Sequence, residues 1–167
     1  FKVGMTGAYP VFGFGRWWTL ITAIYLHGSL LHIGFNMMWV RQLGPVVEDL
    51  YGPMRLFVIF TVAGFTGFLA SAVMGSAYTL GASGSIFGLL AAAIVYGRRV
   101  GSNMFTRQFM QWAVILFIFM GSWVWQPGMF TWITLLGVGL LGYIMKAAGW
   151  PRPPFILGFV LGPVLEN

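Results

Sequence analysis

The chain has 167 residues, of which 59% are hydrophobic and only 7% are charged. This balance excludes an ordinary soluble domain and places the chain in a bilayer, where about 20 apolar residues form one spanning helix. The chain has no cysteine, which excludes disulfides and thiolate metal sites. Its nine Lys and Arg residues are scattered between apolar stretches, so we expect topology signals and no nucleic-acid partner.

The apolar stretches are continuous rather than alternating, which predicts helices and excludes a β-barrel. In chain order they run from Trp17 to Val40, Leu56 to Met74, Ser83 to Tyr96, Phe109 to Trp125 and Phe130 to Met145. The predicted fold class is therefore an all-α polytopic membrane protein, a helical bundle of five to six membrane segments.

The basic residues orient this bundle, because loops rich in Lys and Arg stay on the cytoplasmic side. Seven of the nine fall in the connections 41–55, 98–107 and 146–152, whereas Lys2 and Arg16 precede the first apolar stretch and the connections 75–82 and 126–129 carry no charged residue. We expect an integral protein of a bacterial inner membrane, in contact with the lipid bilayer, with the three basic connections in the cytoplasm.

The stretch that begins at Ser83 is short, and a loop-like run from Tyr78 to Ala82 precedes it. We therefore expect Ser83 to begin its helix inside the membrane, where non-helical backbone is tolerated only beside protein or a water-filled cavity. Glycines on both sides of Ser83 leave room for a substrate backbone, and free N–H groups at a helix start can stabilise an oxyanion. The alternative for Gly81, Gly84 and Gly88 is close packing between helices.

Both histidines fall in a second polar cluster, which we expect to form one helix. His32 and Asn36 are four residues apart and share a helix face, where both could donate to a single anionic oxygen. The alternative is a hydrogen-bonded pair that joins two helices. A metal site at His27 and His32 is disfavoured, because helix geometry turns their rings about 140° apart and no carboxylate completes the shell. We predict no metal and no other cofactor.

Together the two clusters resemble the motifs of rhomboid intramembrane serine proteases. The resemblance is carried by the His-x4-His-x3-Asn run at 27–36 and the Gly-x-Ser-Gly run at 81–84, and extends to 16–18, 39–45, 48, 51–52 and 96–99. It covers about residues 3–115. It also implies one family helix before Phe1 that is missing here.

This resemblance implies a role for each site residue. Ser83 would be the nucleophile that attacks a peptide carbonyl in an unwound transmembrane helix, so the partners would be transmembrane helices of other proteins. His32, Asn36 and the backbone N–H of Ser83 would hold the oxyanion. The supporting residues would be His27, Gly81 and Gly84.

The last third of the chain departs from the family pattern. The family takes the proton of its serine with a histidine on a later helix, commonly in a Trp-x-His setting. Alignment on Trp132 puts Thr134 at the position of this missing base, and threonine cannot act as a base there. The resemblance therefore implies a pseudoenzyme, and a non-catalytic subunit of a larger membrane complex is the alternative.

A second resemblance covers about residues 114–167. This part is similar to the large permease subunit of tripartite tricarboxylate transporters, most clearly at 142–146 and 153–167. It predicts a domain division into a rhomboid-like core, 1–115, and C-terminal membrane helices, 116–167, with either a broken, re-entrant helix or a plain Pro-kinked helix after Arg152. A chimeric sequence and a fragment of a carboxylate permease therefore stay open as readings.

Overall fold

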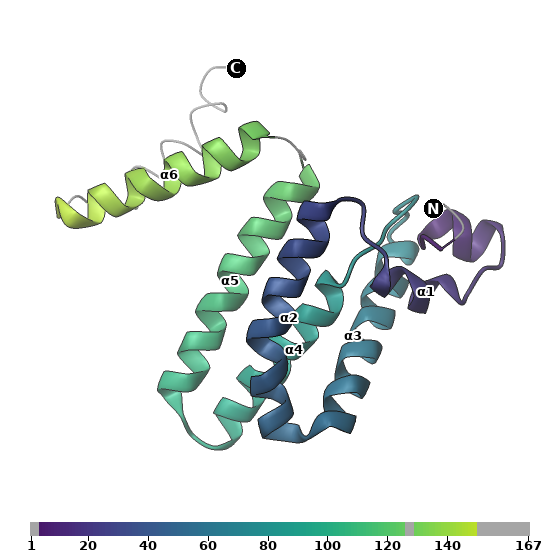
Figure 1. Ribbon diagram of the computed structural model, residues 1–167, viewed down its shortest axis with the longest axis horizontal. Coiled ribbons are helices and arrows are strands. Elements are labelled where there is room, and N and C mark those ends of the chain that lie inside the picture. Colours follow the sequence, from purple (N-terminus) through teal and green to yellow (C-terminus); the bar gives the residue numbers. More distant parts are fainter. Residues whose placement is uncertain (1–3, 126–128, 150–167) are drawn as a thin grey trace. The chain divides into compact units, whose positions relative to one another are not determined.

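The computed structural model describes residues 4–125 and 129–149, and these residues contain helices and no strand. The predicted all-α class is confirmed. The main helices in Figure 1 are α1 (Thr19–Thr22), α2 (Leu30–Tyr51), α3 (Pro53–Val73), α4 (Ser83–Arg99), α5 (Asn103–Trp125) and α6 (Met129–Ala147). A π-helical turn, Tyr9–Gly13, precedes α1, and a 3-10 turn, Ala23–Tyr25, follows it.

Contacts divide the chain into two compact units, Phe1–Leu116 and Phe117–Asn167. The first unit contains α1 to α4 and the beginning of α5. The second contains the end of α5 and α6, which carries Lys146 in its last turn. The predicted domains, 1–115 and 116–167, were drawn from resemblance and stay a prediction. The broken or kinked helix expected after Arg152 lies outside the described residues.

The first apolar stretch is not one continuous helix, which corrects the prediction. The helical run Thr19–Tyr25 and α2 are bent by 89° at the break between them. Ser29 ends the break as the N-cap of α2, because its hydroxyl accepts the backbone N–H of His32 at 3.2 Å. His27 therefore lies before the helix, and the expectation that both histidines share one helix is wrong.

Among the described residues, α3 is the one helix that is long and apolar enough on its own to cross a membrane. The bent run of Thr19–Tyr25 and α2 passes the same test when its two parts are taken together. Length and composition thus identify up to two spans in the described parts of the chain.

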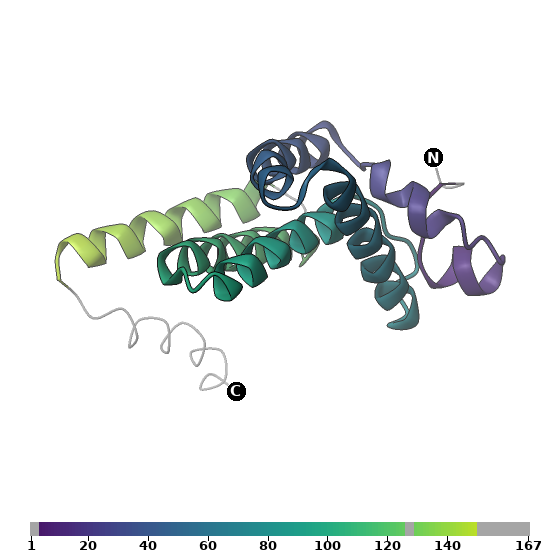
Figure 2. The ribbon, with the colours of Figure 1, turned by 90° about the horizontal axis from the view of Figure 1, so that it is seen from below.

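Helix α4 begins at Ser83, as predicted, and packs most extensively against α3 (Figure 2). Small residues line this crossing. A Cβ on Gly84 would stand 3.8 Å from Gly64 Cα and 3.9 Å from Gly67 Cα, and a Cβ on Gly88 would collide with Ala63. The packing interpretation therefore applies to Gly84 and Gly88.

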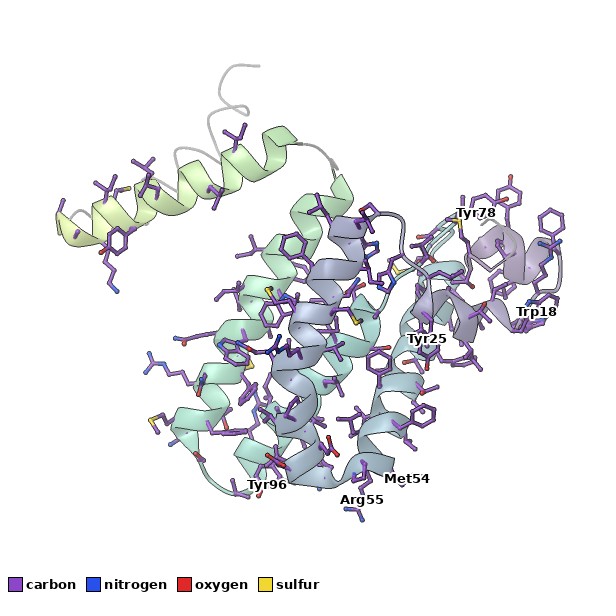
Figure 3. All side chains as sticks on the ribbon, viewed as in Figure 1. Trp18, Tyr25, Met54, Arg55, Tyr78 and Tyr96 are labelled. Carbon is purple, nitrogen blue, oxygen red and sulfur yellow. The ribbon has the colours of Figure 1, made fainter. Side chains whose placement is uncertain are left out.

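Two sets of contacts join elements of the first unit: one joins the residues before α2 to α3, and the other joins the end of α2 to α4. On one side, Val11 and Leu20 pack with Ala72 of α3, which attaches the N-terminal segment to the bundle. On the other side, the Tyr51 hydroxyl donates to the carbonyl of Ala92 at 3.0 Å, and the Tyr51 ring meets Tyr96. Figure 3 shows Tyr96 and Arg55 at this end of the first unit, away from Trp18 and Tyr78.

Candidate functional site

The candidate site lies where the loop before α4 meets the first turns of α2. Gly81 has a φ of +119°, and a Cβ on it would stand 2.6 Å from His32 Cε1, 2.7 Å from Nε2 and 3.8 Å from Asn36 Nδ2. Only a glycine can bring the backbone this close to the imidazole at that φ. The fold therefore joins the two motifs that the sequence separates by almost fifty positions.

The hydrogen bonding of His32 determines what its ring offers to the site. The backbone N–H of Gly28 points to His32 Nδ1 at 3.5 Å, a long hydrogen bond. A neutral imidazole that accepts at one nitrogen carries its proton on the other, so Nε2 is the donor. This donor is the nitrogen that lies against Gly81.

Asn36 is 2% exposed and donates from Nδ2 to the carbonyl of His32 at 3.0 Å, within its own helix. One hydrogen bond leaves a second amide hydrogen on Nδ2, the atom that lies next to Gly81. The bond that fixes Asn36 is thus intrahelical, unlike the interhelical pair considered from the sequence.

His27 lies in the break before α2, and its ring forms a T-shaped pair with the ring of His32 at a centroid distance of 5.1 Å. Both ring nitrogens are buried and have no hydrogen-bond partner among the described residues. Because His27 precedes α2, helix spacing does not set the angle between the two histidine rings. In the described parts of the chain, no three His, Asp or Glu side chains gather as a metal site would require.

Ser83 is half-buried and is the first residue of α4, and Ala82 before it provides no side-chain cap. The first N–H groups of α4 are consequently without a side-chain acceptor from the cap. Ser85 was not singled out by sequence reasoning, although it is fully buried and its hydroxyl has no partner in the described structure. Its hydroxyl lies against Gly64 of α3, so its surroundings are those of a packing residue.

Thr134, where the family pattern places its base, lies in α6 and thus in the second unit. Its assignment as the position of the missing base stays a prediction. The same holds for the roles of Ser83, His32, Asn36 and His27, since geometry alone assigns no catalytic role.

Comparison with known proteins decides the family. The Rhomboid domain matches residues 15–152, which is most of the chain. The chain belongs to the rhomboid family. It is accordingly an integral membrane protein, consistent with the apolar helix α3.

Curated rhomboid relatives match parts of the chain. The rhomboid protease GluP of Bacillus subtilis is 41% identical over 93 residues, which are 56% of this chain and 18% of that protein. RHOMBOID-like protein 1 of Arabidopsis thaliana is 29% identical over 146 residues, 86% of this chain and 34% of that protein. The rhomboid protease GlpG of Serratia proteamaculans is 34% identical over 82 residues, 49% of this chain and 30% of that protein.

This rhomboid chain therefore spans about a third or less of the length of these three relatives. No solved structure matches it. The rhomboid match extends to residue 152, well into the part for which the sequence suggested a transporter permease, and the comparisons do not show that second resemblance.

Proposed function

We propose that this rhomboid chain holds an intramembrane serine peptidase site that binds transmembrane segments but has lost its turnover. Ser83 is the nucleophile of this site, and His32 and Asn36 are its oxyanion donors. The observation that carries the proposal is the contact of Gly81 with the donor nitrogens of His32 and Asn36, two residues before Ser83. Relatives named as rhomboid proteases support the class of reaction.

The chemistry of the reaction explains the lost turnover. As Ser83 Oγ forms a bond to the peptide carbonyl carbon, its proton must leave to a base, which later protonates the departing amine. The chain has two histidines, His27 and His32, and neither occupies the base position of the family. If His32 took the proton, it would stop being an oxyanion donor, and losing one such donor costs about 10²- to 10³-fold in rate.

The missing base also favours the second candidate function, a non-catalytic subunit. Such a subunit would use the same pocket to hold a transmembrane helix of a partner in a larger membrane complex. A permease role rests on the C-terminal resemblance alone and is the weakest of the three. The bacterial inner membrane and the cytoplasmic position of the basic connections remain part of this proposal.

The experiment restores the base. The unmodified chain, Ser83→Ala, Thr134→His, Thr134→His with Ser83→Ala, and the control Ile133→His are purified in detergent. Each is exposed to a fluorophosphonate probe and to a transmembrane-helix substrate, and both binding and cleavage of the helix are measured. We expect labelling and cleavage with Thr134→His only, and their loss when Ser83 is replaced.

Three other outcomes are informative. Labelling of the unmodified chain that disappears in Ser83→Ala would show that it is active as it stands and refute the lost turnover. If Thr134→His stays inert while still binding the helix, the subunit function replaces the peptidase site. If neither protein binds the helix, both functions are excluded.

A further inference from the structure

The N-terminal segment, Gly4–Tyr25, holds the loop that leads to Ser83 at its start, middle and end. At the start of the loop, the N–H of Ala8 donates to the carbonyl of Ser76 at 2.7 Å, and in its middle Thr6 and Thr79 exchange backbone hydrogen bonds of 3.0 Å and 2.6 Å. At its end, the N–H of Gly81 donates to the carbonyl of Ala23 at 2.9 Å. The same segment thus fixes both ends of the loop.

The approach of the two segments is close enough to require a glycine. Gly7 has a φ of +139°, and a Cβ on it would stand 2.5 Å from the carbonyl oxygen of Ala77 and 2.6 Å from that of Ser76. Backbone oxygens cannot move aside as a flexible side chain can. The register of the pairing is therefore fixed by Gly7.

A buried pair of hydroxyls connects the holding points in the middle and at the end of the loop. Thr6 and Thr19 are both 0% exposed, and their hydroxyl oxygens are 3.1 Å apart. The Thr19 hydroxyl also reaches the carbonyl of Arg16 at 2.6 Å. Thr19 has one proton and uses it on that short bond, so the Thr6 hydroxyl is the donor within the pair.

The pair joins two stretches that each hold the loop. Thr6 belongs to the stretch that pairs with Thr79. Thr19 begins the helical run Thr19–Tyr25, which contains Ala23. Because Ala23 holds Gly81, a displacement of either stretch is transmitted to the backbone that lies against His32.

We propose that Thr6 is a positioning residue of the candidate site: its hydroxyl bond to Thr19 keeps the loop 76–82 in register and so sets the distance between Gly81 and the His32 imidazole. This inference rests on the proposed function for the importance of that distance. Its physical content, a link from Thr6 to the His32 ring, does not require turnover.

The test uses the fact that the chain has only two histidines. Selective ¹⁵N labelling of histidine gives an NMR spectrum with the ring signals of His27 and His32 alone. Thr6→Val keeps the shape of the side chain and both backbone hydrogen bonds but removes the hydroxyl. We expect it to shift the His32 signals, and Thr6→Ser, which restores the hydroxyl, to return them.

The matched control is Thr66→Val on α3. The Thr66 hydroxyl bonds only to carbonyls of its own helix, at 2.8 Å to Val62 and 3.2 Å to Ala63, and is exposed. This variant should leave both histidine spectra unchanged. His32 signals of Thr6→Val that superimpose on those of the unmodified chain would overturn the proposal, whatever the result with the fluorophosphonate probe.

A second measurement decides the matter if Thr6→Val does not fold. Amide hydrogen exchange on the unmodified chain should show Thr6, Thr79 and Gly81 opening together with one protection factor, because the segment holds both ends of the loop. If Gly81 stays protected after the amides of Thr6 and Thr79 have exchanged, the link is absent and the proposal fails.

Discussion

Replacing Gly81 by alanine tests whether the contact between the loop and His32 exists as described. The added methyl group would face two penalties. A side chain at a φ of +119° costs about 1–3 kcal/mol in backbone strain. The methyl group would also stand 2.6 Å and 2.7 Å from the His32 ring, an overpacking that costs about 1–3 kcal/mol.

The low end of this second range applies if the ring can rotate away. Rotation would break the contact between His32 Nδ1 and the Gly28 N–H, so it is not free of cost. We therefore expect Gly81→Ala to lower the free energy of unfolding by about 2–6 kcal/mol in total, the sum of both penalties.

Gly75→Ala is the matched control. Gly75 belongs to the connection between α3 and α4, has a φ of +86° and has no heavy atom within 4 Å of its would-be Cβ. Gly75→Ala therefore has the backbone strain of a positive φ but no steric collision of the added methyl group. The two variants should therefore differ by the overpacking penalty of about 1–3 kcal/mol.

The assay is reversible unfolding in mixed micelles of increasing dodecyl sulfate fraction, followed by the fluorescence of the eight tryptophans. Histidine ¹⁵N spectra of the folded variants give the second readout, and only Gly81→Ala should shift His32. Equal stabilities of the two variants, with unchanged His32 signals in both, would refute the geometry of the site.

Three further expectations concern the bundle. Gly88→Ala should destabilise it by about 1–3 kcal/mol, because the added methyl group would collide with Ala63 of α3. The control is Gly67→Ala, whose added methyl group would lie 3.7 Å from Gly84 Cα and should change the unfolding midpoint little. Tyr51→Phe should lose about 0.5–1.5 kcal/mol with its hydrogen bond to α4, measured by the same unfolding assay. Cysteines at Arg55 and Arg99 should be labelled from one face of a sealed vesicle, and labelling from opposite faces would contradict the predicted topology.

Helices α3 to α6 could be predicted because the apolar stretch of each is continuous. The break before α2 could not be predicted from hydropathy. A hydropathy average that includes Leu26 to Ser29 gives one apolar run from Trp17 to Val40. A local signal was present nevertheless: Gly28 and Ser29 precede Leu30, and serine before an apolar helical run is typical of an N-cap. Reading that signal would have placed His27 outside the helix.

Motif order named the candidate residues, whose catalytic roles stay a prediction, but it could not predict their contacts. Gly81 meets His32 through tertiary packing, which no local pattern encodes. The N-terminal segment is the clearest case, because Thr6 pairs with Thr79, 73 positions away, and neither residue stands out in the sequence. Ser85 was missed for a related reason, since only the position of α3 explains why a serine is buried there.

The start of α4 at Ser83 has an electrostatic consequence for the site. Helix α2 starts at Leu30, and the contact of Gly81 with His32 brings this start next to the start of α4. The aligned peptide dipoles of a helix place about half a positive charge at its N-terminus. The N-termini of α2 and α4 together make the electric potential at the candidate site more positive. This effect does not depend on whether His32 is protonated. Loss of the base would remove turnover but leave this potential, so an anionic group should still be favoured here over a neutral one.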